Sequence, residues 1–285
     1  MGIDLSPNAK QCNFDCLYCE LKGSKSVDKA SNTPTCKEVL DALTKALEVH
    51  KNIDVITLTA NGEPTLYPYL DDLVDGIIAI KKEHKLLILS NGSTIADKSM
   101  QKILSKIDIV KLSLDCATQK CFKKLDRPHA SIHLEMIKEG MKAFRQDYKG
   151  ELVLEILVVE GINDTVVEFE ALNLDLQAIK PDRIDVGTID RPPAYAINGV
   201  SMEKVVELSH YLVGLNVNIA YKKEYAQKKR TFSEEEIVEL LKRRPQSFED
   251  VRLCFDEISQ KHLQMLLAKK RLHVKNIAGV SFYTI

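Results

Sequence analysis

The 285-residue chain has almost no net charge and no long apolar segment. Its 40 Lys and Arg residues are balanced by 41 Asp and Glu residues, so the chain as a whole has no field that would recruit nucleic acid or a membrane surface. No apolar run reaches the roughly 18 residues of a membrane span, and the first residues lack the pattern of a secretory signal. The seven cysteines, an odd number, fit a reducing compartment better than a disulfide framework. We therefore expect a cytoplasmic protein.

Apolar strand patterns alternate with helical patterns over the first 212 residues. Strands are expected at 2–5, 53–59, 85–90, 109–115, 152–159 and 183–187, and helices at 35–51, 70–83, 97–105, 118–125, 133–146, 165–178 and 201–212. This alternation predicts parallel βαβ units. About six units are too few for a closed eight-stranded barrel, so we expect an open partial (β/α)6 barrel over residues 1–222. Its ligands should lie at the carboxyl ends of the strands.

The C-terminal residues 229–285 have a different pattern. A capping box at Ser233 and Glu236 predicts a first helix, further helices are expected at 248–255 and 261–269, and 272–283 resembles a β-hairpin. Three helices and a hairpin resemble a winged-helix module. From Lys222 onward there are 14 Lys and Arg against 9 Asp and Glu. RNA or DNA contact through Lys269, Lys270, Arg271 and Lys275 is one interpretation; a protein-docking or lid module is the other.

Three cysteines, Cys12, Cys16 and Cys19, stand in one polar loop with the spacing C-x3-C-x2-C. A four-iron cluster normally takes four cysteine ligands, so three would leave one iron open to another ligand. A zinc site is the alternative, but structural zinc takes four ligands in paired short spacings, and the nearest further cysteine is Cys36. The remaining cysteines, Cys116, Cys121 and Cys254, are expected to be small buried or half-buried thiols without partners.

This cysteine spacing, with Tyr18 before the last cysteine, resembles the signature of the radical S-adenosylmethionine (radical SAM) superfamily. Over residues 1–200 the chain is similar to Fe–S oxidoreductases related to wyosine-tRNA synthase, through the segments 2–7, 61–65, 90–92, 113–115, 126–129, 161–164 and 190–194. The resemblance implies a [4Fe–4S] cluster that cleaves SAM to a 5′-deoxyadenosyl radical, which abstracts a hydrogen atom from a substrate, with a tRNA base as candidate. It also implies an electron donor such as flavodoxin or ferredoxin.

The resemblance assigns roles to residues at the strand exits. Cys12, Cys16 and Cys19 would hold the cluster, and Tyr18 would pack near the adenine of SAM. Gly62 and Glu63 would receive the SAM amino group, although Gly62 also suits a plain turn. The remaining implied SAM contacts are Ser90 and Asn91 at the carboxylate or ribose, Ser113 and Asp115 at the ribose or methionyl end, and Asn163 at adenine. For Asn163 a turn-forming role is the alternative.

Four cations are candidates for the substrate side: Lys111, Arg127, His129 and Arg191. They would suit an anionic substrate through charge-assisted hydrogen bonds, although each alone is also typical of a solvated surface, and Arg127 also suits a helix C-terminus. Wyosine synthase carries a second cluster on cysteines that precede the first. No cysteine precedes Cys12 here, which argues against wyosine formation itself. A nucleic-acid-binding redox regulator with a cluster but no SAM turnover is the competing function, whereas a plain electron carrier would leave the strand-exit motifs without a use.

Overall fold

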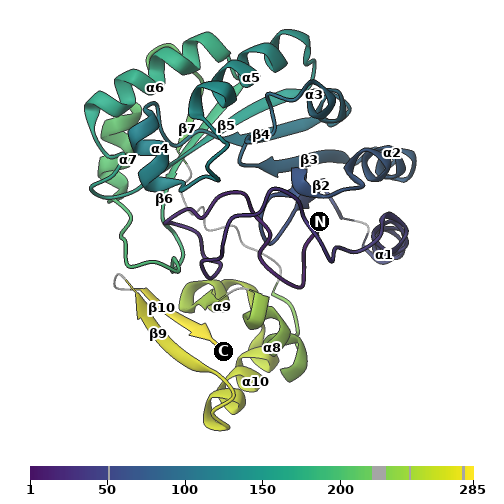
Figure 1. The fold of residues 1–285 in the computed structure, drawn as a ribbon. Coiled ribbons are helices and arrows are strands. Elements are labelled where there is room, and N and C mark those ends of the chain that lie inside the picture. The colour runs from purple at the N-terminus through teal and green to yellow at the C-terminus, as the bar shows by residue number, and fades with distance from the viewer. Residues whose placement is uncertain (51, 220–228, 244, 278–279) are drawn as a thin grey trace. The chain divides into compact units, whose positions relative to one another are not determined.

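The computed structural model describes residues 1–50, 52–219, 229–243, 245–277 and 280–285. The chain folds as two units, one formed by residues 1–189 and 193–220 and the other by 190–192 and 221–285 (Figure 1). The boundary expected between residues 222 and 229 lies outside the described residues.

The first unit is built on one parallel sheet whose strands follow each other in chain order. These strands are β1 (Gly2–Asp4), β2 (Val55–Thr59), β3 (Lys85–Ser90), β4 (Ile109–Ser113), β5 (Glu151–Val158), β6 (Arg183–Thr188) and β7 (Val217–Ile219). The expected α/β partial barrel is confirmed. It has one strand more than the six expected, because β7 is too short for its three residues to show a period in the sequence.

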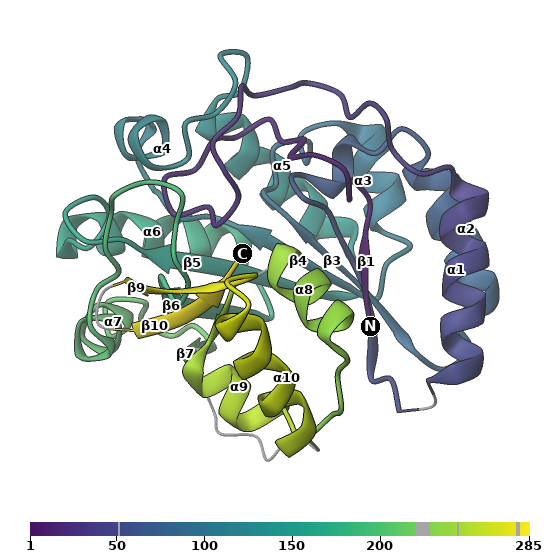
Figure 2. The same ribbon diagram turned by 90° about the horizontal axis from the view of Figure 1, so that it is seen from below.

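In the described part of this unit, seven helices and a short 3-10 helix connect the strands. They are α1 (Cys36–Val49), η1 (Pro64–Leu66), α2 (Leu70–Ile80), α3 (Lys98–Leu104), α4 (Gln119–Leu125), α5 (Leu134–Asp147), α6 (Val166–Ile179) and α7 (Met202–Ser209). Neighbouring helices pack on each other, α1 on α2, α2 on α3, and α4 through α7 in series. Figure 2 shows them in an arc around the strands. Because the helices cover one face, the other face forms the interior of a half-open barrel.

The pleat of the strands separates an apolar outer face from a polar inner face. On β4, Val110 and Leu112 are fully buried, whereas Lys111 and Ser113 between them are only partly buried. On β5, Leu154 and Ile156 are fully buried on either side of the partly exposed Glu155. Since successive side chains of a strand point to opposite faces, Lys111, Ser113 and Glu155 face the barrel interior.

Aspartates before two strands anchor the neighbouring strand. Asp108, just before β4, accepts hydrogen bonds from the Leu86 N–H of β3 at 2.7 Å and from Lys81 Nζ at 2.8 Å. Asp182, just before β6, accepts one from the Leu152 N–H of β5 at 2.7 Å. Burial alone would raise the pKa of Asp108, but the Lys81 ammonium and the Leu86 N–H lower it below its usual value. The charged carboxylate therefore stabilises the start of the sheet.

Cys116 and Cys121 form a disulfide, with their Cα atoms 5.6 Å apart. The expectation of unpaired thiols is wrong for these two residues. Cys116 follows β4, and the chain then turns at Thr118, whose side chain accepts a hydrogen bond from the Cys121 N–H at 3.2 Å and caps α4. This tight turn returns Cys121 to Cys116. Cys36 and Cys254 form no disulfide.

Among its described residues, the second unit contains three helices and a small antiparallel sheet. In chain order its elements are α8 (Glu234–Arg243), β8 (Gln246–Ser247), α9 (Phe248–Cys254), α10 (Glu257–Ala268), β9 (His273–Ile277) and β10 (Val280–Thr284). The sheet order is β8-β10-β9, and the unit has its own core, in which Ile237, Phe255, Leu263 and Leu266 are at most 1% exposed. The strand β8 was not expected, and the tip of the expected hairpin, residues 278–279, lies outside the described residues. No helix in the described parts of the chain is long and apolar enough to cross a membrane.

Candidate metal and cofactor site

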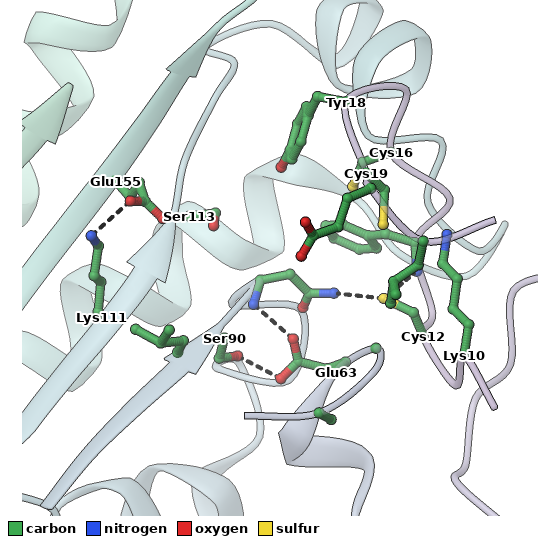
Figure 3. A pocket seen from close by; sticks show the side chains of 17 residues that line it. Lys10, Cys12, Cys16, Tyr18, Cys19, Glu63, Ser90, Lys111, Ser113 and Glu155 are labelled. Atoms are coloured by element: carbon green, nitrogen blue, oxygen red, sulfur yellow. Dashed lines mark hydrogen bonds and ion pairs between the residues drawn. The ribbon is translucent and has the colours of Figure 1, made fainter. Parts of the chain in front are cut away.

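A cavity of about 250 Å³ opens where the first strands of the barrel end (Figure 3). Four stretches of chain line it: the cysteine loop that follows β1, the turn after β2, the end of β3, and the inner face of β4 and β5. Its lining residues include Cys12, Cys16, Tyr18, Cys19, Gly62, Glu63, Ser90, Asn91, Lys111 and Ser113. The motifs that stand apart in the sequence thus share one cavity at the carboxyl ends of parallel strands.

The three loop cysteines gather on one side of this cavity (Figure 3). Burial, followed by the nearby Glu63 carboxylate, raises the pKa of the Cys12 thiol to about 12, and burial raises the pKa of Cys16 well above its usual value. Thiols in such a place ionise only when a cation replaces their protons. The chemistry of this donor set therefore fits a bound metal centre.

The spacing of the sulfur atoms bears on which centre fits. A tetrahedral zinc ion would place its sulfur ligands about 3.8 Å apart. Among the described residues, the group of three ligand atoms found within 4.8 Å of one another is Cys116, Cys121 and Glu168, not the loop cysteines. The sulfur atoms of Cys12, Cys16 and Cys19 therefore do not all lie within 4.8 Å of one another, as the ligands of one zinc ion would. No fourth free cysteine of the described chain lines the cavity.

Gly62 lets the turn after β2 cross the cysteine loop at close range. The Gln11 N–H donates to the Asn61 carbonyl at 2.8 Å, and the Glu63 N–H donates to the Gln11 carbonyl at 2.9 Å. A Cβ atom on Gly62 would lie 1.8 Å from the Gln11 carbonyl oxygen, and Gly62 has a φ of +138°. Only glycine fits this position, so Gly62 fixes the start of the cysteine loop against β2.

Glu63 is buried and its carboxylate is fully engaged by the protein. Its Oε1 atom accepts hydrogen bonds from the Thr65 N–H at 3.0 Å, the Thr65 hydroxyl and the Ser90 hydroxyl, both at 2.7 Å, and its Oε2 atom accepts one from the Asn91 N–H at 2.7 Å. The Asn91 side chain in turn donates to Cys12 Sγ at 3.7 Å and to Asn13 Oδ1 at 2.9 Å. Glu63, Ser90 and Asn91 thus form a network that supports the cysteine loop.

Tyr18 joins the cysteine loop to the end of β4. Its hydroxyl donates to Asp115 Oδ2 at 2.7 Å, and Asp115 Oδ1 accepts the Leu157 N–H at 2.7 Å. Burial raises the pKa of Asp115 to about 7, and burial together with the neighbouring Asp115 charge raises that of Asp126 well above its usual value. Asp126 also lies 3.6 Å from Cys16 Sγ. Two buried carboxyl groups this close do not both ionise readily.

Asn163 is fully buried and does not line the cavity. Its Nδ2 atom donates to the carbonyls of Asp115 and Leu157, both at 2.9 Å, and its Oδ1 atom accepts the Val159 N–H at 2.7 Å. These bonds leave no polar atom free for adenine. The structure therefore favours the turn-forming role that the sequence also allowed, and a contact of Asn163 with SAM stays a prediction.

The candidate substrate cations lie in different places. Lys111 lines the cavity, where its Nζ atom is 2.7 Å from Glu155 Oε1 and 3.0 Å from Asp185 Oδ2. Arg127 is exposed, pairs with Asp15 at 3.4 Å and stacks over the Tyr195 ring. His129 contacts the Ser131 hydroxyl at 2.8 Å and does not line the cavity. Arg191 belongs to the second unit, so its role stays a prediction.

Several cavity residues escaped the sequence reasoning, among them Lys10 and Glu155. Glu155 is the single charge within the apolar stretch 152–159, a signal that the strand has one polar face. Lys10 gives no such signal, because it precedes Cys12 in a polar loop. Burial alone would lower the pKa of Lys10, but the Cys19 thiol and Asp15 raise it above its usual value.

A family model and curated proteins are similar to this chain. The family model described as "Radical SAM superfamily" matches residues 9–172. A UPF0026 protein of Helicobacter pylori (strain ATCC 700392 / 26695) is 37% identical over 286 residues, covering 99% of this chain and 92% of that protein. A UPF0026 protein of Synechocystis is 33% identical over 67% of this chain and 71% of its own length.

Solved structures show the same fold. Streptococcus suis SuiB bound to S-adenosylmethionine has a TM-score of 0.60 and 19% identity, over 83% of this chain and 54% of that one. A radical SAM methyltransferase from Sphaerobacter thermophilus has a TM-score of 0.59 and 14% identity, over 77% and 66%. The chain therefore belongs to the radical SAM superfamily, whose cofactors are a [4Fe–4S] cluster and S-adenosylmethionine.

Proposed function

We propose that this chain is a radical SAM enzyme in which Cys12, Cys16 and Cys19 hold the cluster and the adjoining cavity takes SAM. The observation that carries the proposal is the meeting of exactly these three free cysteines, without a fourth from the described chain, with the strand-exit residues around one cavity. When bound, the reduced cluster supplies one electron that cleaves SAM to methionine and a 5′-deoxyadenosyl radical, which takes a hydrogen atom from the substrate.

The residues around the cavity divide the remaining tasks. Tyr18, Gly62 and Ser113 line the cavity and would contact SAM. Asp115 does not line it and would act by holding Tyr18 through the hydrogen bond to its hydroxyl. Ser113 suits a ribose hydroxyl, because its own hydroxyl has no protein partner among the described residues. Glu63, Ser90 and Asn91 would act mainly by holding the loop, since their hydrogen bonds connect it to β2 and β3. Burial of the thiols keeps water from the centre.

On the substrate side, Lys111 and its partner Glu155 are the charged residues that the cavity offers beyond the cysteine loop. A tRNA base remains the candidate substrate that the family resemblance suggests. An external one-electron reductant is general in this family, and flavodoxin or ferredoxin would suit that role.

Anaerobic reconstitution with iron and sulfide tests the proposal. We expect the spectrum of a four-iron cluster and, after addition of dithionite and SAM, methionine and 5′-deoxyadenosine. Cys16→Ala should abolish both. Cys36→Ala is the matched control, because Cys36 is a free thiol that does not line the cavity, and it should behave as wild type. Retention of the cluster and of SAM cleavage by Cys16→Ala would refute the ligand assignment.

For the second unit we propose a winged-helix-like module. The support is the order helix, strand, helix, helix, strand, strand from α8 to β10, which is the order of that fold. Nucleic-acid contact has mixed support: Lys269 pairs with Glu234 at 2.9 Å and Arg271 with the same carboxylate at 4.0 Å, whereas Lys270 and Lys275 are exposed. The acidic partner lowers the positive potential that RNA would need.

Fluorescence anisotropy with bulk tRNA separates the two interpretations of this unit. Binding that weakens steeply with salt and is lost in Lys270→Gln/Lys275→Gln would support RNA contact, and Lys45→Gln, an exposed lysine of α1, is the control. Binding of that kind without any SAM cleavage would instead favour the redox-regulator function. Absence of binding would leave protein docking as the role of the module.

A further inference from the structure

Lys10 places an enclosed positive charge beside the cluster cysteines. Its side chain is 7% exposed, and it lines the same cavity as Cys12 and Cys19 (Figure 3). Its ammonium interacts electrostatically with both thiols. A lysine side chain so poorly exposed to water is uncommon unless it has a specific partner.

Asp15 holds Lys10 in this position. The Lys10 Nζ atom lies 3.2 Å from Asp15 Oδ1, and Asp15 stands in the loop between Cys12 and Cys16. The other carboxylate oxygen, Oδ2, is 3.4 Å from Arg127 Nη1 and accepts a hydrogen bond from the Tyr195 hydroxyl. Two cations thus share one carboxylate, so the group formed by Lys10, Arg127 and Asp15 carries a net charge of +1.

A positive charge beside the cysteines would affect the one-electron reduction of a bound cluster. Three thiolates and a four-iron cluster carry net negative charge, and one-electron reduction adds a further negative charge. A fixed cation in a poorly solvated site favours the more negative state, because Coulomb interactions are weakly screened there. We propose that Lys10 is a positioning residue whose ammonium raises the midpoint potential of the cluster and so eases its reduction. This inference rests on the function proposed above.

Redox titration of the full, anaerobically reconstituted chain, followed by electron paramagnetic resonance with dithionite as reductant, tests the proposal. Lys10→Gln should lower the ratio of reduced to oxidised cluster at a fixed potential about tenfold, a downward shift of about 59 mV for a one-electron couple. Lys10→Arg should restore the wild-type potential. Lys22→Gln removes an equal charge from an exposed position of the same loop and should leave the potential unchanged.

Asp15→Asn supplies a test of opposite sign, because it removes the negative charge and leaves both cations. Its potential should rise. A fully loaded Lys10→Gln protein with the wild-type potential overturns the proposal. If Lys10→Gln fails to retain iron, the Asp15→Asn variant tests the proposal instead. A midpoint potential of Asp15→Asn that is equal to or lower than that of wild type overturns the proposal. A wild-type chain that takes up no four-iron cluster overturns the proposed function itself, which iron and sulfide content reveal before any titration.

Discussion

The carbonyl oxygen of Gln11 lies where a side chain on Gly62 would have to begin. A Cβ atom at position 62 would come within 1.8 Å of that oxygen, and the contact occurs where the cysteine loop leaves β1 and passes the exit of β2. Two backbone hydrogen bonds join the two segments: the Gln11 N–H donates to the Asn61 carbonyl, and the Glu63 N–H donates to the Gln11 carbonyl. The geometry of the cysteine loop therefore depends on Gly62, which is far from the cysteines in sequence.

Gly62→Ala should displace the cysteine loop. We expect a loss of stability on the order of 3 kcal/mol, as for other severe steric clashes, and loss of most of the bound iron after reconstitution. Gly161→Ala is the control, because Gly161 also has a positive φ, of +68°, but a Cβ there meets nothing within 4 Å. That variant should lose only the roughly 1–2 kcal/mol of left-handed strain and keep its iron. Equal iron contents in the two variants would contradict this account.

Tyr18→Phe removes the 2.7 Å hydrogen bond to Asp115 and leaves the ring in place. A buried acceptor that loses its donor costs about 1–3 kcal/mol, so the midpoint of urea unfolding should fall accordingly. Tyr69→Phe is the matched control, since Tyr69 is 48% exposed, and its midpoint should stay within experimental error of wild type. A wild-type midpoint for Tyr18→Phe would show that the hydroxyl contributes nothing to the fold.

Much of the fold could be predicted from local sequence patterns. The strand 85–90 and the helix near 119–125 were predictable because an apolar run or a helical period ends at a turn residue. The spacing of the cysteines identifies the cysteine loop within eight residues. The contacts that define the site were not predictable. Lys111 forms ion pairs with Glu155 and Asp185, which lie on two other strands. Which residues pair in this way depends on strand register, and no local sequence pattern encodes the register.

Two further features could not be read from the sequence, for specific reasons. Asn163 stands in a motif at a strand exit, where ligand contact and turn formation use the same residue types; its three hydrogen bonds to backbone groups favour turn formation. Cys116 and Cys121 are separated by five positions, which suits a disulfide only if the chain reverses between them. The Thr118 cap produces that reversal, but a cap predicts the start of a helix rather than the path of the residues before it.

The Cys116–Cys121 disulfide should be detectable in protein purified without reductant. Alkylation of the denatured chain followed by mass spectrometry should find a linked peptide that contains both residues, with Cys36 and Cys254 alkylated. Closing a loop this small stabilises a fold by about 2 kcal/mol, so reductant should lower the unfolding midpoint of wild type but not of Cys121→Ser. Recovery of both cysteines in alkylated form would contradict the bond.

The buried pair Asp115 and Asp126 should make the stability of the iron-free protein depend on pH. In the unfolded chain both carboxyl groups are ionised above about pH 4. In the folded chain burial raises the pKa of Asp115 to about 7 and that of Asp126 well above its usual value, so between about pH 4 and 7 the folded state binds more protons than the unfolded state. Stability from this pair is therefore present at low pH and is lost as the pH rises, at up to about 1.4 kcal/mol per pH unit for each titrating group.

Asp126→Asn isolates this effect, because the amide keeps the shape of the side chain but does not titrate. From pH 5 to pH 8 the urea midpoint of wild type should fall relative to that of Asp126→Asn, and the variant should be the more stable protein at pH 8. Asp164→Asn, at an aspartate that is only partly buried, is the control and should run parallel to wild type. Parallel curves for Asp126→Asn and wild type would mean that solvent reaches the carboxyl pair and that the Tyr18 bond alone holds Asp115 in place.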